Sequence, residues 1–285
     1  MKQPNRPTSF LKKLTKYSAF VLSILFSLSI LSGFISNPFT KGVEAEGEIE
    51  IYYLQDLDAI RNDMSASYVL MNDLDFNSDS SYDQTDVDWN TKKTAWTTGT
   101  GWTPIGDWDT RFTGTIDGND YEIANLFISA SGAQFQGLIG VIENGSINNL
   151  GLTNLSLDAS WMSGGLVGLT DNASIDNCFT TGTLSLIEGT YMGGLVGSVQ
   201  NGSNISNSYS SATVSGDDIS MKIGGLLGEL RNSTISNSYF TGSIPSGGVD
   251  APYWTIGGLI GTTTGSTITS CYSTGDVAGY GEVGG

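Results

Sequence analysis

The sequence predicts an all-β fold, a parallel β-helix (β-solenoid) of three-strand coils, each about 30 residues long, with an N-terminal α/β cap. The first observation behind this prediction is a five-residue motif with a double glycine that recurs along the chain. The second is an isoleucine between polar neighbours at a near-constant distance after each motif. Short strands of this kind cannot bury their apolar faces alone, whereas stacked coils can.

The double-glycine motif sets the period. It occurs as GGLVG at Gly164 and Gly193, GGLLG at Gly224, GGLIG at Gly257 and, in a degenerate form, QGLIG at Gln136. From Gly137 onward the spacings are 28, 29, 31 and 33 residues. Helical repeats of this period need long apolar-periodic stretches, which Gly, Ser and Asn interrupt here, and propeller blades need longer repeats. The period therefore favours one solenoid coil per repeat.

One isoleucine per unit is expected to form a buried ladder along the coils. These residues are Ile147, Ile175, Ile205, Ile235 and Ile268, and polar residues flank each of them. A polar, apolar, polar triplet is typical of a strand with one buried face. Equivalent residues of neighbouring coils should then lie about 4.8 Å apart, the ordinary spacing of paired strands.

Aromatic and asparagine residues form two further columns after the isoleucine. The aromatic column holds Phe179, Tyr209, Tyr239 and Tyr272, and the asparagine column holds Asn177, Asn207 and Asn237. An aromatic ladder that points outward could hold glycans, but we favour a ladder that helps to seal the coils. For the asparagines we expect an amide ladder with a structural role.

The length of the units varies almost wholly in one loop, which precedes each double glycine. The longest version, IPSGGVDAPYWTIGG, contains Tyr253 and Trp254. Insertions on one face of a solenoid often build its binding face. Tyr253 and Trp254 are therefore candidate ligand contacts, and a plain surface turn is the alternative.

The first 45 residues differ from the rest and are predicted to be a secretory signal peptide. Three lysines precede an apolar run from Ala19 to Ile35, and a polar stretch that ends in the small residues Val43 and Ala45 follows. An uncleaved signal anchor is the alternative, because this run of 17 residues lies at the short edge of spanning length. Cleavage after Ala45 predicts a secreted or cell-surface protein.

Residues 46–130 do not repeat and are predicted to hold a cap and the first coils, which leaves residues 131–285 as the repeat region. Apolar residues at helical spacing predict a helix over residues 53–64. SYVLMNDLDF follows as a strand, and FTGTIDGNDYEIANLFIS supplies further strands around an Asp-Gly-Asn turn. A helix at the open end would cover strand edges that otherwise invite aggregation.

The chain is strongly acidic. It has 29 Asp and Glu against 12 Lys and Arg, and removal of residues 1–45, with six basic residues and one acidic residue, would leave a formal charge of −22. Nucleic acid and anionic membrane surfaces are therefore poor partners. We expect no nucleic-acid partner and no membrane contact after signal cleavage.

No catalytic centre is predicted. The chain has no histidine, the commonest acid–base side chain at neutral pH, and no acidic pair stands out from ordinary turn residues. Cys178 and Cys271 share a column but lie three coils apart, about 14 Å at ordinary strand spacing. That separation is too long for a disulfide, so both are expected to be free thiols.

One acidic loop alternates oxygen side chains as calcium loops do. Its candidate ligands are Asp73, Asp75, Asn77 and Asp79. Ser78 occupies the turn position that helix–loop–helix calcium sites give to Gly, and Gln84 occupies the twelfth position, where those sites have Glu. We therefore favour a solvated acidic loop, and calcium is the one cofactor for which the sequence offers ligands.

The chain resembles the GLUG-motif repeat proteins, bacterial surface and adhesin-like proteins of which some are relatives of IgA peptidases. The resemblance rests on the GGLVG and NCF/NSY columns and on SYVLMNDLDF, WTPIG and FTGTIDGNDYEIANL ahead of them, and it covers about residues 49–285. It implies an extracellular β-helix used as an adhesin or stalk. It brings no peptidase, because the zinc motif HExxH cannot occur in a chain without histidine.

These patterns predict a non-catalytic secreted or cell-surface β-solenoid that serves as an adhesin, stalk or scaffold. A glycan-binding or calcium-dependent module is the first alternative, and a carbohydrate-active β-helix enzyme is the second. The expected partners are a host or environmental surface, a glycan or a cell-wall component. Because GYGEVGG ends just inside a sixth unit, we also expect further repeats downstream, with end-to-end self-association as the alternative.

Overall fold

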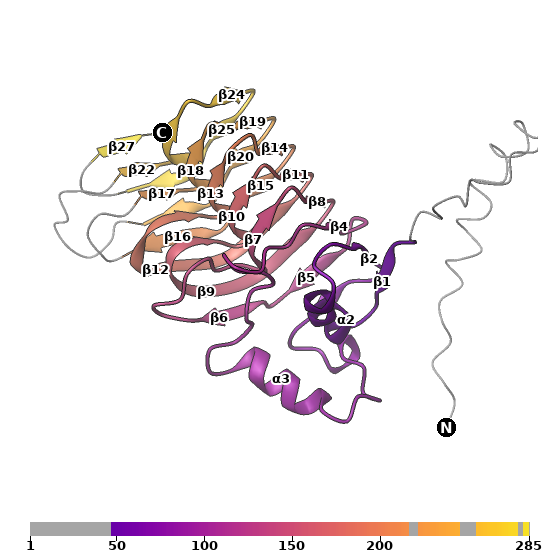
Figure 1. Cartoon of the computed structure of the whole chain (residues 1–285). Helices are drawn as coiled ribbons and strands as arrows, with labels where there is room; N and C mark the ends of the chain where they lie inside the picture. The colour runs from indigo at the N-terminus through magenta and orange to yellow at the C-terminus, as the bar shows by residue number, and fades with distance from the viewer. Residues whose placement is uncertain (1–46, 217–221, 246–254, 279–281, 285) are drawn as a thin grey trace, which may run out of the picture. The chain divides into compact units, whose positions relative to one another are not determined.

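The structure, a computed structural model, describes residues 47–216, 222–245, 255–278 and 282–284. They form a β-solenoid whose strands stack in parallel from one coil to the next (Figure 1). The predicted fold class, a parallel β-solenoid with little helix, is confirmed. The predicted signal peptide at 1–45 and the candidate contacts Tyr253 and Trp254 lie outside the described residues.

Three sheets run along the solenoid. Sheet A has the order β1 (Ile49–Ile51), β2 (Ser67–Leu70), β4 (Thr115–Asp117), β8 (Ser146–Asn148), β11 (Ser174–Asp176), β14 (Asn204–Ser206), β19 (Thr234–Ser236) and β24 (Thr267–Thr269). Sheet C has five strands, β7 (Ile139–Glu143), β10 (Val167–Asp171), β13 (Val196–Gln200), β18 (Leu227–Arg231) and β23 (Ile260–Thr264).

Sheet B is the largest, with 14 strands. Its strands are β3 (Leu74–Asp75), β5 (Glu122–Ala124), β6 (Phe127–Ser129), β9 (Gly151–Gly164), β12 (Phe179–Gly193), β15 (Tyr209–Ser210), β16 (Thr213–Gly216), β17 (Lys222–Gly224), β20 (Tyr239–Phe240), β21 (Ser243–Ile244), β22 (Thr255–Gly257), β25 (Tyr272–Ser273), β26 (Asp276–Val277) and β27 (Glu282–Gly284). The two long strands, β9 and β12, each carry the segments that later coils divide among three short strands.

The isoleucine column forms the centre of sheet A. Backbone pairing aligns Ile147, Ile175, Ile205, Ile235 and Ile268 in successive strands. The first four side chains are at most 1% exposed, whereas Ile268, which pairs on one side only, is 46% exposed. The polar neighbours of each isoleucine point away from the core, because successive side chains of a strand lie on opposite faces.

The coils turn at residues with left-handed backbone conformation. One such corner follows sheet A and includes Asn149, Asn177, Asn207 and Asn237, with φ between 50° and 55°. A second corner follows sheet C and includes Asn144, Asn172, Asn201 and Asn232, with φ between 49° and 56°. Asparagine tolerates this conformation better than most residues that carry a side chain, which explains why it recurs at both corners. In the last described coil, Gly265 and Ser270 take the two corner positions, with φ of 65° and 55°.

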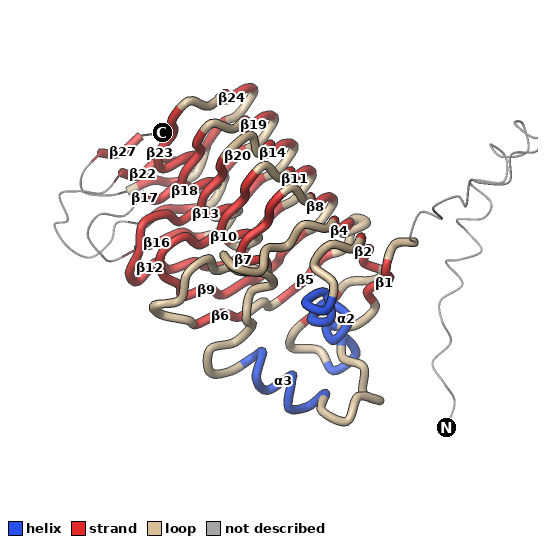
Figure 2. The backbone as a smooth tube through the Cα atoms, viewed as in Figure 1, coloured by secondary structure: helices blue, strands red, loops and turns tan. Residues whose placement is uncertain are grey.

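The N-terminal region adds the helices. The predicted helix over 53–64 is found as α2 (Leu54–Ala59) followed by a 3₁₀ turn, η1 (Ile60–Asn62), beside β1 (Figure 2). A carboxylate oxygen of Asp56 accepts the backbone N–H of Tyr53 at 2.9 Å, and this contact caps the start of the helix. The buried side chains Leu54, Leu57 and Ile60 join the core.

A second helix, α3 (Trp89–Thr97), was not expected from the sequence. It follows the 3₁₀ turn η2 (Asp79–Ser81) and is anchored by Trp96. The Trp96 ring packs against Phe76, Tyr82 and Trp102 at centroid distances of 6.3, 5.9 and 5.3 Å. No helix in the described part of the chain is long and apolar enough to cross a membrane.

Candidate binding groove and surface ladders

The aromatic column forms a continuous stack on sheet B. Ring centroids of Phe179, Tyr209, Tyr239 and Tyr272 are 5.0, 4.8 and 5.1 Å apart, with interplanar angles of at most 5°. The rings lie on the outer side, since the flanking Cys178 and Thr180 point into the core. Partial burial raises the pKa of the Tyr209 hydroxyl, with a smaller effect from Tyr239 beside it.

The stacked rings cover one another's faces. Phe179 also lies over Gly151, where an added Cβ would meet the ring at 2.4 Å. The ladder therefore exposes mainly ring edges and hydroxyl groups to solvent. Tyr272, at the end of the stack, is the exception with 52% exposure. A sugar ring packs on the face of an aromatic ring, so the geometry suits a coil-to-coil seal better than a glycan platform.

The predicted asparagine column is an amide ladder at the corner after sheet A. Asn177 Nδ2 donates to Asn149 Oδ1 at 2.9 Å, and Asn237 Nδ2 donates to Asn207 Oδ1 at 3.3 Å. Asn207 Nδ2 donates instead to Asp176 Oδ1 at 2.7 Å. These bonds link neighbouring coils at residues that the left-handed turn already requires, which gives the column a structural role.

The acidic loop does not gather its four candidate ligands. These are Asp73, Asp75, Asn77 and Asp79, and each carboxylate has a different partner. Asp75 Oδ1 accepts Asn125 Nδ2 at 2.7 Å, and Asp79 forms an ion pair with Lys93. Within the described ranges, no three His, Cys, Asp or Glu side chains are grouped for metal ligation. The expectation of a solvated acidic loop, with calcium as the alternative, stays a prediction.

Both cysteines are free, as expected from their spacing. Cys178, between β11 and β12, is buried and donates its thiol hydrogen to Asp176 O at 3.3 Å. Burial raises the pKa of the Cys178 thiol to about 12. Cys271 is partly exposed. Because the thiolate is the reactive form, Cys178 is chemically inert in the folded chain.

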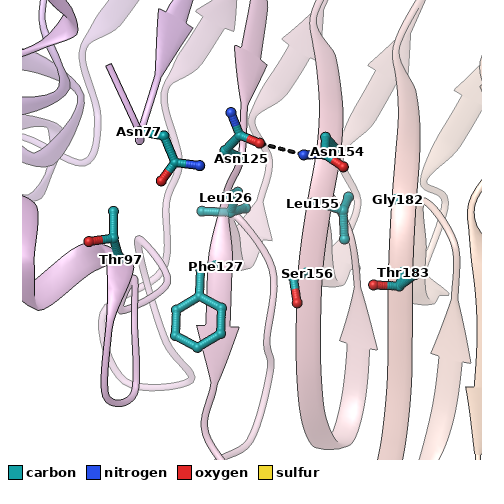
Figure 3. A pocket seen from close by; sticks show the side chains of 10 residues that line it. All are labelled: Asn77, Thr97, Asn125, Leu126, Phe127, Asn154, Leu155, Ser156, Gly182 and Thr183. Carbon is teal, nitrogen blue, oxygen red and sulfur yellow. Dashed lines mark hydrogen bonds between the residues drawn. The ribbon is translucent and has the colours of Figure 1, made fainter. Parts of the chain in front are cut away.

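A groove of about 290 Å³ on the described surface combines several unpaired polar groups (Figure 3). Its lining comes from the N-terminal region and from the first coils, at the corner between β5 and β6 and at the matching places in β9 and β12. The lining residues are Asn77, Thr97, Asn125, Leu126, Phe127, Asn154, Leu155, Ser156, Gly182 and Thr183. Figure 3 shows the three asparagines in one row and Phe127, Ser156 and Thr183 in another below them.

The groove exists because the corner changes length between coils. In β9, two residues, Thr153 and Asn154, lie between Leu152 and Leu155, whereas β12 places only Thr181 between the corresponding residues. Asn125 and Asn154 adopt the left-handed conformation with φ of 60° and 53°. The chain then tightens at Gly182, with φ of 122°, where an added Cβ would meet Leu155 O at 2.2 Å. This step leaves space beside Asn154.

The side chains that line the groove are neutral. Asn125 is held in place by both of its polar atoms, since Nδ2 donates to Asp75 Oδ1 and Oδ1 accepts Asn154 Nδ2. Thr97 is placed by α3 and donates to Lys93 O at 2.7 Å. The sequence carried a weak signal of this site: ANL at 124–126 and TNL at 153–155 have no counterpart in the later units.

The comparisons agree with the repeat pattern. The family model of the GLUG motif matches residues 159–185, 188–215 and 253–278. Each match contains one double-glycine motif, at Gly164, Gly193 and Gly257 respectively. The chain therefore carries GLUG repeats, and the prediction from the sequence is confirmed.

Two curated proteins resemble parts of the chain. Halomucin of Haloquadratum walsbyi is 34% identical over 184 residues, 62% of this chain and 2% of halomucin. A protein of Evansella cellulosilytica described as a Gly-rich membrane protein is 40% identical over 86 residues, 27% of this chain and 10% of that protein. The chain thus spans only a small part of the curated relatives that it matches.

Two solved structures share the fold. An IgA1 protease matches with a TM-score of 0.60 and 21% identity over 86% of this chain and 18% of that chain. A Bacteroides ovatus protein described as an immunoglobulin A1 protease matches with a TM-score of 0.56 and 19% identity over 85% of both chains. At this identity the likeness establishes the solenoid fold alone.

Proposed function

We propose that this GLUG-repeat β-solenoid is a non-catalytic secreted or cell-surface protein that works as an adhesin or as the stalk that carries one. The observation behind the proposal is the continuity of sheet A, which joins eight strands from β1 to β24 in one parallel ladder. In such a solenoid each coil contacts only its neighbours, so added coils extend the molecule without changing its core. This construction suits a protein whose task is to span distance and present a surface.

The repeated surface supports the same proposal. The aromatic and asparagine columns place similar side chains at successive coils, whereas an enzyme concentrates different groups at one point. The names of two relatives, halomucin and a Gly-rich membrane protein, also fit a location at the cell surface. The strong negative charge favours solubility outside the cell rather than binding to anionic surfaces.

Cells that express the full chain, compared with cells that lack the gene, test the proposal. We expect antibodies to label the protein on intact cells and protease treatment of intact cells to remove it. We also expect cells without the gene to adhere less well to glycan-coated or cell-coated surfaces. Labelling only after the cells are broken open, or adhesion that does not depend on the gene, would contradict the proposal.

Removal of a single coil separates the stalk from the adhesive region. Deletion of residues 194–224 joins Gly193 to Gly225, so the double glycine and the strand register are kept. Because the groove is built from residues 77–183, the shortened protein should fold and cells should still adhere. Loss of adhesion with normal surface display would place the adhesive contacts in the removed coil.

A further inference from the structure

We infer that the groove at the corner of the first coils binds a short segment of a neutral glycan; this inference rests on the proposed surface function and names the class of its partner. The volume of about 290 Å³ is at the lower end of the range of small-molecule sites, which suits one or two sugar units. The groove lies where the N-terminal region meets the first coils, so its lining combines residues that the repeat does not supply.

The groove offers the polar groups that a sugar needs. The side chains of Asn77, Ser156 and Thr183 make no hydrogen bond to any described residue, and neither does Asn154 Oδ1. An amide offers both donors and an acceptor, and a hydroxyl offers one donor with two acceptor sites. Adjacent hydroxyl groups of a sugar ring both donate and accept, so they match this mixed set.

One aromatic ring completes the lining. Phe127 lies on β6, is partly exposed, and stacks on no other aromatic ring of the described residues. It therefore differs from the tyrosine ladder, whose rings cover each other. The apolar face of a sugar can pack on such a ring, while its hydroxyl groups reach the amides opposite.

The charge distribution selects a neutral ligand. None of the ten described lining residues is charged. Lys93, whose Nζ donates to the backbone oxygen of Asn77 at 3.3 Å, is already paired with Asp79 and so is neutralised as a partner for a sulfated or carboxylated glycan. Asp75 lies behind Asn125 and is bonded to its amide, which adds negative charge nearby. An anionic chain would be repelled by this charge and by the acidic protein as a whole.

The groove is rigid before the ligand arrives. Asn125 is bonded to Asp75 on one side and to Asn154 on the other. Ser156 pairs with Phe127 on one side and with Thr183 on the other in the parallel ladder of sheet B. Neighbouring members of this row are therefore about 4.8 Å apart along the solenoid. Preorganised polar groups lower the entropy cost of binding a flexible sugar chain.

Binding of the full chain to an array of neutral glucan, mannan and galactan oligosaccharides tests the inference, with sulfated and uronic-acid glycans on the same array. We expect at least one neutral oligosaccharide to bind, and titration calorimetry with that oligosaccharide then gives the affinity. Binding should persist in the presence of a chelator, because no step of the recognition needs the acidic loop to hold calcium. Binding of charged glycans alone, or of none, would overturn the inference.

Two variants locate the site. Asn77→Ala removes an amide that has no partner in the described protein, and we expect affinity about tenfold lower, the loss of one hydrogen bond to the sugar. Thr183→Tyr fills the groove and should abolish binding. Thr234→Tyr is the matched control, because Thr234 is also an exposed strand threonine but lies on sheet A.

Circular dichroism melting should give the same Tm for all three variants. Full affinity in both groove variants would show that the glycan binds elsewhere and would overturn the inference. Cell adhesion separates this result from the proposed function: if the gene still supports adhesion while the groove variants bind glycan normally, the surface role stands and the site falls.

Discussion

Two buried threonines allow a sharp test of how the solenoid core handles polar groups. Thr170 and Thr180 are both fully buried. Thr180 Oγ1 donates to Gly194 O at 2.8 Å, whereas Thr170 Oγ1 has no hydrogen-bond partner. In the ladder of sheet C, Thr170 lies between Ile142 and Val199, where an apolar side chain would match its neighbours. We therefore expect Thr170→Val and Thr180→Val to shift stability in opposite directions.

The magnitude follows from the cost of a buried hydroxyl without a partner, about 1–3 kcal/mol. Valine has nearly the same shape, so Thr170→Val should remove much of this cost and stabilise the fold by about 1–2 kcal/mol. For a folded unit of this size, each kcal/mol corresponds to about 2–4 °C, so Tm should rise by roughly 2–8 °C. Thr180→Val loses a hydrogen bond and should destabilise the fold by about 1 kcal/mol.

Thermal melting followed by circular dichroism gives the sign of each change. Solenoids can unfold a few coils at a time, so hydrogen exchange of the β10 amides should accompany the melting curves. Slower exchange in Thr170→Val and faster exchange in Thr180→Val are the expected results. A lower Tm for Thr170→Val, or equal shifts for the two variants, would refute this account of the core.

Three further predictions concern the ladder, the acidic loop and the buried thiol. Ile205→Asp should unfold neighbouring coils and lower Tm strongly, because an unpaired carboxylate in an apolar core costs several kcal/mol; an unchanged melting curve would contradict the ladder register. Added calcium should leave Tm unchanged in the wild type and in Asp75→Ala, since each carboxylate has its own partner; a rise that only the wild type shows would establish a calcium site. Cys178 has a raised pKa in the fold, so the unfolded chain releases the thiol proton first, and the protein should lose stability as the pH rises from ~9 toward 12. Chemical denaturation of Cys178→Ser should show a smaller loss of stability over the same pH range.

The sequence was sufficient for the fold because its period is carried by core residues. An isoleucine at an equivalent place in each unit must pack on the isoleucines above and below, so alignment of the units gave the pairing that the structure shows from Ile147 to Ile268. The asparagine column followed from the same alignment. Its physical cause is the left-handed backbone at each corner, which asparagine tolerates well; Ser270 adopts the same conformation, with φ of 55°, in the last described coil.

The groove could not be predicted, because it depends on an irregularity of one residue. The repeating columns do not fix the number of residues at the corner before Ser156 and Thr183, and only the strand register reveals the extra residue in β9. Helix α3 escaped prediction for another reason. Its segment, WNTKKTAWT, buries a single large side chain, Trp96, so it lacks the apolar period that marks an amphipathic helix.

The aromatic column shows a third limit of the sequence. Spacing alone places Phe179 and Tyr209 in register, but it does not tell which side of the strand they occupy. The structure has them outside the core and stacked face to face, at 5.0 Å. Whether an aromatic residue can hold a ligand depends on which ring face is open, and that depends on its neighbours in space.

The parallel ladders also determine how the molecule would carry mechanical tension. The backbone hydrogen bonds between coils, such as Leu166 N to Leu195 O and Leu195 N to Leu226 O, point along the solenoid axis. A pull along that axis therefore loads the bonds of all three sheets within a coil side by side, and transmits the same force from one coil to the next. The breaking force of such a rod is set by its weakest junction between coils and not by the number of coils, so a lineage can lengthen the reach of the protein by duplicating units without lowering the strength of the tether.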